Sequence, residues 1–477
     1  MKDDTNEGDE RGMGTTDGER DEARALATAS AAFEQRGGTI AREVRIGRVR
    51  GDLECRSSSH ANARGVFARE DIDRDRACDL ITIPRRAMIA ARAEGDGKTK
   101  TTNIAEAQDE LAIELLRIKS RGKDDDFSSY IATMPKKYNL LHSWSEAEMA
   151  ALQDGRAKTR AIELKKAMSR AFERVKDEVL GILSAQANVD DAWAAYAWAR
   201  DTVSSRAVSV PFHAAGALTP MGDMFNYAPH DPPVLVKVCG APMFDVREDD
   251  GGESDSKDDD RAPTPGDGAY VNDEIGFTFR SAAQAEGRRG IRAGEEIFVC
   301  YGDYTNLELL ELYGFTLKPD ENPQDAYVLD VKVGAEAVPL KVFVGGFAWN
   351  DLAEVRIAFA TKRSRKNEKA LRDIARRGGA LGVDEELETF AAIREAAANA
   401  LLSFPTTAKS DSDTLHSGDL SNLSENMVLA ITWRLGVKRI VQRAYKWADE
   451  RANEARMAKL EAGIAQISLP YVTSGRR

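Results

Sequence analysis

The 477-residue chain is poor in cysteine and histidine, and the few it has are scattered. The four cysteines, which form no CxxC or CxC pair, are Cys55, Cys78, Cys239 and Cys300. A zinc site needs clustered thiolate or imidazole ligands, so the sequence predicts no metal site. Separated free thiols are typical of a reducing compartment.

Long apolar runs and a basic charge balance are missing as well. No window approaches the ~20 consecutive apolar residues that cross a bilayer, so no membrane segment is expected. The net charge of −12 argues against binding to nucleic acid, which requires a basic surface. Residues 1–22 are acidic and contain no apolar segment, unlike a secretory signal or an organelle transit peptide. We therefore expect a cytosolic or nuclear location.

Several common enzyme signatures are absent. GDGKT at 95–99 resembles part of a phosphate-binding loop, but Arg92 stands where that loop needs its first glycine. No GxGxxG follows a predicted strand, and no GxSxG or HExxH motif is present. The sequence therefore gives no support to dinucleotide binding, serine hydrolase chemistry or zinc protease chemistry.

Hydrophobic periodicity predicts an α+β fold in which β-rich and helical segments alternate. Residues 1–19 are polar and charged, and we expect them to be disordered. Short strand-like segments fill 40–88, and helical spacing prevails from about 101 to 202. Further strands follow, interrupted at 245–268 by an acidic low-complexity loop that we expect to be disordered. A β-rich patch and then mostly helical sequence make up residues 326–477.

Three stretches place polar residues inside otherwise apolar sequence: SSHANARGVFA at 58–68, SSRAV at 204–208 and PMGDMFNYAP at 220–229. A buried polar group without a partner costs about 1–3 kcal/mol, so such residues need a reason to be there. Asp223 and Asn226 either serve a site or bind their own backbone and close turns.

A fourth stretch, IFVCYGDYTNLELLELYGF at 297–315, sets one tyrosine at the end of an apolar strand and another after a helix. These are Tyr301 and Tyr313. Buried tyrosines often pack with their hydroxyl bonded to a neighbour. The alternative is that the two hydroxyls frame a reaction pocket.

Taken in order, these stretches resemble a SET-domain protein methyltransferase of the Rubisco large-subunit methyltransferase type. PMGDMFNYAP matches the family's PxxDxxNH, and RAGEEIFVCYGDYTNLELLELYGF matches its GEE…YG…YGF segment. LAIELLRIKSRGKDDDFSSYIATMP is similar to the start of the family's helical insert. The resemblance implies a β-rich SET domain with a knot-like substructure over 20–325, containing the helical insert, and a helical substrate-binding domain over 326–477.

The resemblance also implies a role for individual residues. Tyr301 is expected to be the catalytic tyrosine, with Tyr313 shaping the pocket beside it and contacting the cofactor. Asn62 and Arg64 are expected against the methionine part of S-adenosylmethionine, the cofactor of this family.

The remaining implied site residues lie in the second and third polar stretches. Ser205 and Arg206 are expected to line the cofactor and acceptor channel. Asp223 is expected to offer its backbone carbonyl near the transferring methyl group. Asn226 and Tyr227 are expected to hold the adenine, although the family usually has histidine where this chain has Tyr227.

The function implied by the resemblance is a protein-lysine N-methyltransferase that uses S-adenosylmethionine and acts on a non-histone protein by in-line transfer. Such chemistry needs no metal, because alignment and a desolvated channel supply much of the barrier reduction. A protein substrate, no nucleic-acid or membrane partner and a monomeric chain are expected. Two alternatives stay open: a protein-histidine N-methyltransferase, and a catalytically weak SET-fold scaffold.

Overall fold

The computed structural model describes most of the chain and confirms the α+β class. The described residues are 17–48, 64–73, 78–91, 103–183, 187–210, 213–229, 245–247, 268–272, 276–281, 290–363, 368–379, 381–417 and 420–462. Among these residues, no helix is long and apolar enough to cross a bilayer. The same residues contain no group of three or more candidate metal-binding side chains. Cys78 and Cys300 are both partly buried.

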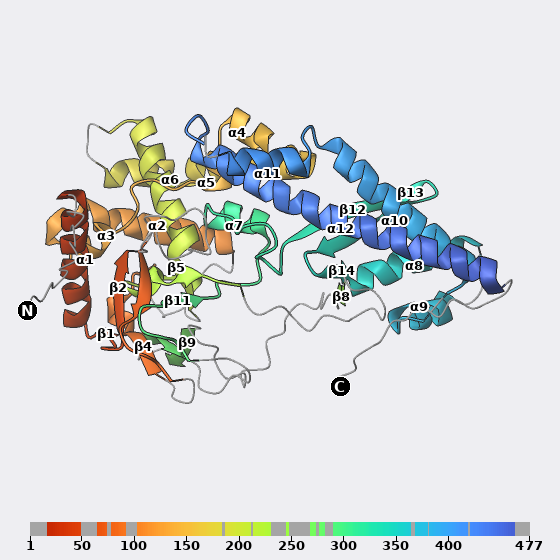
Figure 1. The fold of residues 1–477 in the computed structure, drawn as a ribbon. Coiled ribbons are helices and arrows are strands. Elements are labelled where there is room, and N and C mark those ends of the chain that lie inside the picture. Colours follow the sequence, from red (N-terminus) through yellow and green to blue (C-terminus); the bar gives the residue numbers. More distant parts are fainter. Residues whose placement is uncertain are drawn as a thin grey trace, which may run out of the picture.

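The N-terminal strands form two small sheets and a hairpin at one end of the molecule (Figure 1). The first sheet has the order β1-β4-β10-β9, with bounds Thr39–Ile40, Cys78–Ile83, Gly276–Ser281 and Gly268–Asn272. The second has the order β2-β3-β11-β7, with bounds Val44–Arg48, Arg64–Ala68, Glu296–Val299 and Asn226–Tyr227. The hairpin pairs β5 and β6, with bounds Ala207–Val210 and His213–Leu218.

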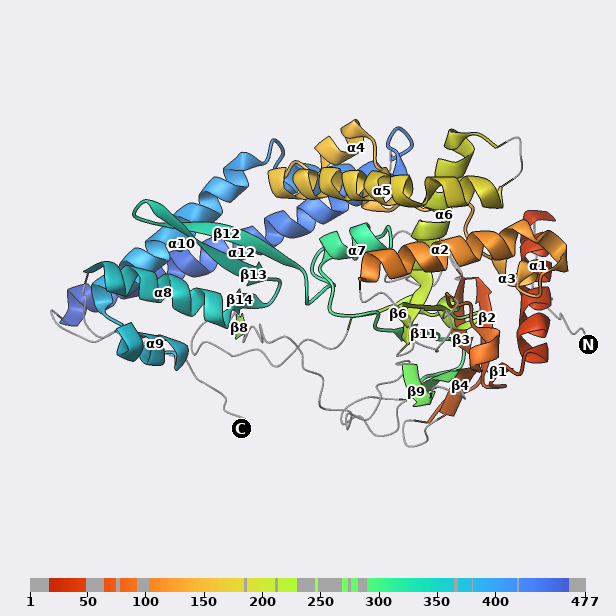
Figure 2. The same ribbon diagram turned by 180° about the vertical axis from the view of Figure 1, so that it is seen from behind.

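Helices cover one side of these strands, as the reverse view shows (Figure 2). The N-terminal helix and the predicted helical insert contribute α1 to α6, with bounds Asp17–Gln35, Ile104–Ser120, Ser128–Ile131, Glu146–Ala151, Gly155–Ile182 and Val189–Arg206. Asn103 caps α2 by accepting a hydrogen bond from the Ala105 N–H. Ser145 and Glu148 form a full capping box at α4.

The C-terminal part combines a third sheet with long helices. Its strands have the order β12-β13-β14-β8, with bounds Ala326–Val333, Glu336–Phe343, Gly346–Ala348 and Asp245–Arg247. Helix α7 (Asn306–Leu312) lies between this sheet and the N-terminal strands in both views (Figures 1 and 2). The helices that follow are α8 to α12, with bounds Trp349–Arg363, Glu368–Arg376, Val383–Ser403, Ala408–His416 and Glu425–Ala462.

Three expected boundaries differ from the structure. Helix α1 begins at Asp17, inside the tail expected to be disordered, because a polar run rich in Glu, Arg and Ala still favours helix. Helix α6 continues past residue 202 to Arg206, with the Ser205 hydroxyl donating to the Asp201 carbonyl inside the last turn. Strand β8 begins at Asp245, at the edge of the acidic loop, because its backbone pairs in parallel with β14.

The hydrophobic core has two main parts that do not follow the expected domain boundary at 325/326. One part joins α1, the N-terminal strands and most of the insert. The other joins the C-terminal sheet and helices to residues of the insert, among them Trp144 and Leu152. The insert therefore packs against both halves and fixes the region between them.

Candidate active site

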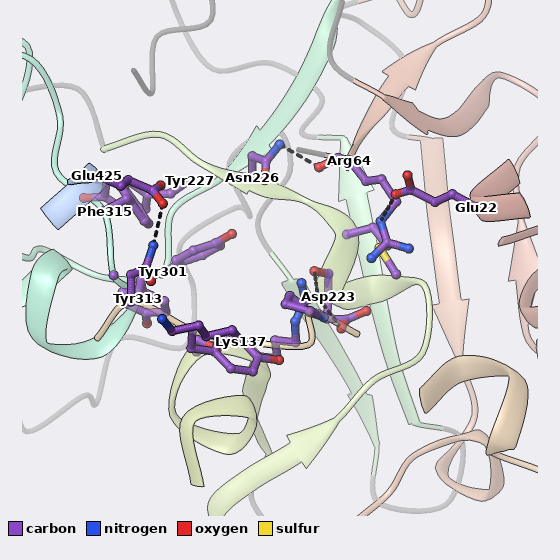
Figure 3. A pocket seen from close by; sticks show the side chains of 17 residues that line it. Glu22, Arg64, Lys137, Asp223, Asn226, Tyr227, Tyr301, Tyr313, Phe315 and Glu425 are labelled. Carbon is purple, nitrogen blue, oxygen red and sulfur yellow. Dashed lines mark hydrogen bonds and ion pairs between the residues drawn. The ribbon is translucent and has the colours of Figure 1, made fainter. Parts of the chain in front are cut away.

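A cavity of about 410 Å³ lies where the second sheet, the insert and α7 meet (Figure 3). It contains the described site residues that the sequence predicted, together with several that it did not. Its lining consists of Glu22, Arg64, Pro135, Lys137, Tyr138, Asn139, Ser205, Arg206, Asp223, Met224, Asn226, Tyr227, Tyr301, Tyr313, Gly314, Phe315 and Glu425. Asn62 lies outside the described residues. The volume falls in the range of about 300–1,000 Å³ typical of small-molecule sites.

A short parallel ladder brings the two main motifs together. Strand β7 pairs with β11, with Phe298 opposite Asn226 and Val299 opposite Tyr227. The ladder continues where the Ala228 N–H donates to the Val299 carbonyl at 3.1 Å. Residues some 70 positions apart therefore become neighbours, and Tyr301 follows directly from the end of the pairing.

The Tyr301 hydroxyl is held by the backbone of the other motif. It donates to the Phe225 carbonyl at 2.6 Å. The Tyr301 ring centroid lies 5.3 Å from that of Tyr227 and 4.9 Å from that of Tyr313. Burial raises the pKa of Tyr301 above its usual range, so the hydroxyl stays protonated at neutral pH.

Tyr313 is positioned by the end of α7. Thr305 and Glu308 form a capping box at the start of that helix, and Tyr313 is its C-cap. The chain then turns through Gly314 at a φ of 74°, where a Cβ atom would meet the Asn139 backbone at 3.1 Å. Burial raises the pKa of the Tyr313 hydroxyl, so this group is also a neutral donor.

The Asn226 side chain fastens β7 to the neighbouring strands. Its amide nitrogen donates to the Arg64 carbonyl at 2.9 Å and to Glu296 Oε1 at 2.5 Å. Gly65 allows this approach, because a Cβ atom there would lie 2.4 Å from Glu296 Oε1. Burial raises the pKa of Glu296, while the bond from Asn226 opposes that rise.

Tyr227 presents its ring to the cavity and its hydroxyl to the backbone. The hydroxyl donates to the Gly302 carbonyl at 3.2 Å, and the ring centroid lies 5.9 Å from that of Phe315. The backbone of Tyr227 takes part in the ladder with β11. The departure from histidine therefore leaves the strand pairing at this position in place.

Arg206 and Asp223 form a buried ion pair at the centre of the cavity. Arg206 Nη1 lies 2.8 Å from Asp223 Oδ2, which also accepts from the Tyr130 hydroxyl at 2.9 Å. The Asp223 side chain is 1% exposed, and its Oδ1 has no hydrogen-bond partner among the described residues. Although burial alone lowers the pKa of Arg206, the negative charge of Asp223 raises it overall. A buried carboxylate oxygen without a partner, on a residue that lines a cavity, is suited to receive a ligand donor.

Arg64 and Glu22 occupy the far end of the cavity from the aromatic side chains (Figure 3). Arg64 Nε lies 3.6 Å from Glu22 Oε1, and Arg64 Nη2 donates to the Thr133 carbonyl. Burial and the nearby charge of Arg206 lower the pKa of Arg64. The two ends therefore differ in chemistry: one is aromatic and the other is ionic.

Five polar lining residues were not predicted from the sequence: Glu22, Lys137, Tyr138, Asn139 and Glu425. Glu22 lies on α1, and Glu425 opens α12 and accepts from Asn139 Nδ2 at 2.7 Å. Neither carboxylate stands in an unusual local pattern, so only the tertiary arrangement identifies them. Phe315 had a signal, since it completes the YGF segment of the stretch at 297–315.

Comparisons with known proteins identify relatives of this chain. No family model matches the chain. Protein SET DOMAIN GROUP 40 of Arabidopsis thaliana is 24% identical over 375 residues, covering 75% of this chain and 72% of that protein. The chloroplastic Rubisco large subunit N-methyltransferase of Pisum sativum is 23% identical over 410 residues, covering 79% of this chain and 74% of that protein.

Solved structures of Rubisco large-subunit methyltransferase share the fold. The structure bound to sinefungin and monomethyllysine has a TM-score of 0.59 at 18% identity, covering 91% of this chain and 93% of that one. The structure bound to S-adenosylmethionine has a TM-score of 0.58 at 17% identity and covers 93% of this chain and 97% of that one. The predicted resemblance to SET-domain protein methyltransferases of this type, and the predicted fold, are confirmed.

The expected cytosolic or nuclear location is wrong by the same comparisons. Three of the relatives are chloroplastic enzymes, including the fructose-bisphosphate aldolase lysine N-methyltransferase of Arabidopsis thaliana, 22% identical over 276 residues. The expectation rested on the acidity of residues 1–22, most of which lie outside the described residues. The composition of one short segment is a weaker guide to compartment than the location of several relatives.

Proposed function

We propose that this chain, built on the SET fold of the Rubisco large-subunit methyltransferase type, is a protein-lysine N-methyltransferase acting on a non-histone protein. The observation that carries the proposal is the placement of the Tyr301 hydroxyl, on the Phe225 carbonyl and between Tyr227 and Tyr313, in one cavity. Two relatives are named after the proteins they methylate, the Rubisco large subunit and fructose-bisphosphate aldolase. These names support a protein acceptor.

The cavity fits S-adenosylmethionine by its own chemistry. The aromatic end, formed by Tyr227, Tyr313 and Phe315, suits a flat purine, because aromatic faces stack with it. The ionic end, with Arg64 and Glu22, suits a zwitterionic amino acid. When bound, the cofactor supplies a methyl group on a positively charged sulfur.

The residues between the two ends have the features that methyl transfer to an amine requires. A lysine side chain has a pKa near ~10.4 in water, and only its neutral form is a nucleophile. Burial among Tyr301, Tyr313 and the neighbouring backbone disfavours the ammonium form and promotes loss of its proton. The Tyr301 hydroxyl and the carbonyls of Phe225 and Asp223 are polar groups fixed before the reaction, which can orient the amine and stabilise the polarised methyl.

The other site assignments belong to the same proposal. Arg64, Arg206, Asn226, Tyr227 and Tyr313 bind the cofactor, as does Asn62, which lies outside the described residues. Ser205, Asp223 and Tyr301 line the acceptor channel. The transfer is in line, because the methyl carbon must lie between the sulfur and the entering nitrogen.

The domain assignments also remain proposals. Residues 20–325 form the catalytic domain, and residues 326–477 dock the protein substrate. We also propose that the enzyme is a monomer. Neither nucleic acid nor a membrane takes part.

The test is transfer of isotopically labelled methyl from S-adenosylmethionine into a lysate of the source cells, followed by hydrolysis and identification of the labelled amino acid. Wild type should produce N-methyl-lysine. Tyr301→Phe should lower the rate by about a hundredfold, the effect typical of removing one fixed hydrogen-bond donor from a reaction site. Tyr445→Phe, an exposed tyrosine on α12, is the matched control and should behave as wild type.

Each other result has a definite meaning. Label recovered on histidine would replace the lysine acceptor with the histidine alternative. Equal rates for wild type and Tyr301→Phe would remove Tyr301 from the reaction. A folded protein with neither transfer nor cofactor binding would favour the scaffold alternative.

A further inference from the structure

The N-terminal helix α1 contributes a carboxylate to the wall of the cavity. Glu22 stands in the second turn of this helix and lines the cavity at its ionic end. The same face of α1, about two to three turns further along, is anchored by Ala29 and Phe33, which are almost fully buried in the core. The helix therefore holds Glu22 at a fixed place, although it lies outside the sheets that form the rest of the site.

Glu22 lies between two guanidinium groups. Its Oε2 accepts from Arg48 Nε at 3.0 Å, and its Oε1 lies 3.6 Å from Arg64 Nε. The Glu22 side chain is 32% exposed, whereas that of Arg64 is 12% exposed. Glu22 Oε2 is therefore held by a hydrogen bond from Arg48. Oε1, on the side of Arg64, makes only the longer contact at 3.6 Å.

Arg64 is paired less closely than the other arginine of the cavity. Arg206 has Asp223 as a counter-ion at 2.8 Å, while the ion pair of Arg64 with Glu22 is 0.8 Å longer. Burial and Arg206 both disfavour the positive charge of Arg64. A nearby anion would offset both effects, so this end of the cavity is suited to a ligand that brings its own negative charge.

We infer that Glu22 and Arg64 together bind the amino-acid end of the cofactor, with Arg64 receiving the α-carboxylate and Glu22 the α-ammonium group. The inference rests on the proposed function and extends it, because it makes α1 part of the cofactor site. The separation of ionic and aromatic ends in Figure 3 fixes which end of the ligand lies here.

The test compares ligands that differ only at this end. S-adenosylhomocysteine carries both the carboxylate and the ammonium group, its desamino analogue lacks the ammonium, and 5′-methylthioadenosine lacks the whole amino acid. Binding of each is measured by calorimetry to the full chain, as wild type, Glu22→Gln, Glu22→Asp and Glu34→Gln. Glu34 lies on the same helix and is absent from the lining of this cavity, although it lines a neighbouring one with Glu22 and Arg64; it is the control for loss of a charge on α1.

Glu22→Gln should weaken S-adenosylhomocysteine binding about tenfold, since a hydrogen bond to a charged group is lost. It should leave the affinities for the desamino analogue and 5′-methylthioadenosine within about twofold of wild type, because neither ligand carries the ammonium group that Glu22 binds. A change of about twofold is the size of the deviations seen between independent sites. Glu22→Asp should recover part of the loss, and Glu34→Gln should change nothing.

Two results would overturn the inference while leaving the proposed function intact. One is an equal loss for all three ligands in Glu22→Gln, which would show that Glu22 only supports the fold. The other is no loss for any ligand. If wild type binds none of the three ligands, the proposed function fails and the inference fails with it.

Discussion

Two buried aspartates in this molecule are surrounded by cations, yet their carboxylates differ in one respect. Asp223, at the cavity, has Arg206 and Tyr130 as partners of Oδ2 and none among the described residues on Oδ1. Asp411, between α11 and α12, uses both oxygens. Arg434 and Thr406 donate to Oδ1 at 2.7 and 2.8 Å, and Lys438 donates to Oδ2 at 2.5 Å.

The difference separates a binding group from a structural one. The Asp411 cluster also includes Gln153 of the insert, which accepts from Lys438, so it ties the insert to the C-terminal helices. Both oxygens of the Asp411 carboxylate therefore accept hydrogen bonds from groups of the protein itself. Asp223 has one oxygen without a partner among the described residues, and it lines a cavity. Buried charge alone therefore does not distinguish the two aspartates, whereas an unsatisfied polar atom on a cavity-lining residue does.

A third buried aspartate, Asp325, sharpens the comparison because the contacts that hold it come from amides. It accepts from the Asn306 N–H at 3.0 Å and the Asn306 side chain at 3.1 Å. Burial raises the pKa of Asp325 to about 7, although the hydrogen bonds donated by the amide groups oppose the rise. Because the pKa is higher in the folded state than in the unfolded state, the contribution of Asp325 to stability should be fully present below about pH 4 and be lost as pH rises through 7.

The loss attributable to Asp325 should reach about 4 kcal/mol above pH 8. The measurement is urea unfolding of wild type and Asp325→Asn from pH 4 to pH 8. The variant should lose much less stability over this interval. Parallel curves for the two proteins would show that Asp325 ionises normally.

The Asp411 cluster should be sensitive to a substitution that keeps its shape. In Asp411→Asn, one oxygen becomes an NH₂ donor that faces the Lys438 ammonium, so two buried cations lose their counter-charge. We expect a loss of about 3 kcal/mol in the free energy of unfolding. Asp413→Asn, on the same helix but exposed and paired only with Lys409, should cost about 0.5 kcal/mol or less. Similar losses for both variants would contradict the structural role.

The same substitution at Asp223 should have the opposite consequence. Asparagine keeps an oxygen for Arg206 and Tyr130 and changes only the atom that lacks a partner. We expect methyl transfer to fall by about a hundredfold, as for other fixed polar groups of a reaction site, while unfolding changes less than in Asp411→Asn. Urea unfolding and labelled transfer on the same preparation measure both. A variant that unfolds easily but transfers normally when folded would reverse the comparison.

The smallest effect is expected at Tyr227. The family histidine can be restored with Tyr227→His, which removes the hydroxyl bond to Gly302 and part of the ring contact with Tyr301. The backbone pairing with β11 does not depend on the side chain. Affinity for S-adenosylhomocysteine should change by about threefold or less, equivalent to less than 1 kcal/mol. A change of about a hundredfold would show that the side chain itself holds the adenine.

Local sequence patterns predicted the parts of the site that lie within one segment. Tyr301 at a strand end, Tyr313 after a helix and Asn226 in an apolar run are visible because each breaks a local pattern. Glu22 and Asp411 break none, since acidic residues are ordinary on helices. Their roles come from contacts with Arg64 and with Lys438 that depend on how distant elements pack.

Strand pairing could likewise be predicted only where both strands lie in one short segment of the chain. Strands β12 and β13 were predicted, because alternating residues and a short turn define a hairpin locally. The parallel pairing of β8 with β14 joins residues about a hundred positions apart. Composition predicted only an acidic loop there, since nothing in the loop itself indicates its partner.

The central claim is that the cavity around Tyr301, with its open Asp223 oxygen, is where S-adenosylmethionine binds. The most direct measurement is ultraviolet crosslinking of methyl-labelled S-adenosylmethionine to the purified chain, followed by peptide mapping. The account predicts saturable labelling, prevented by S-adenosylhomocysteine, in peptides covering 222–229 or 298–318. Saturable labelling confined to the C-terminal helices, or no saturable labelling of a folded protein, would contradict it.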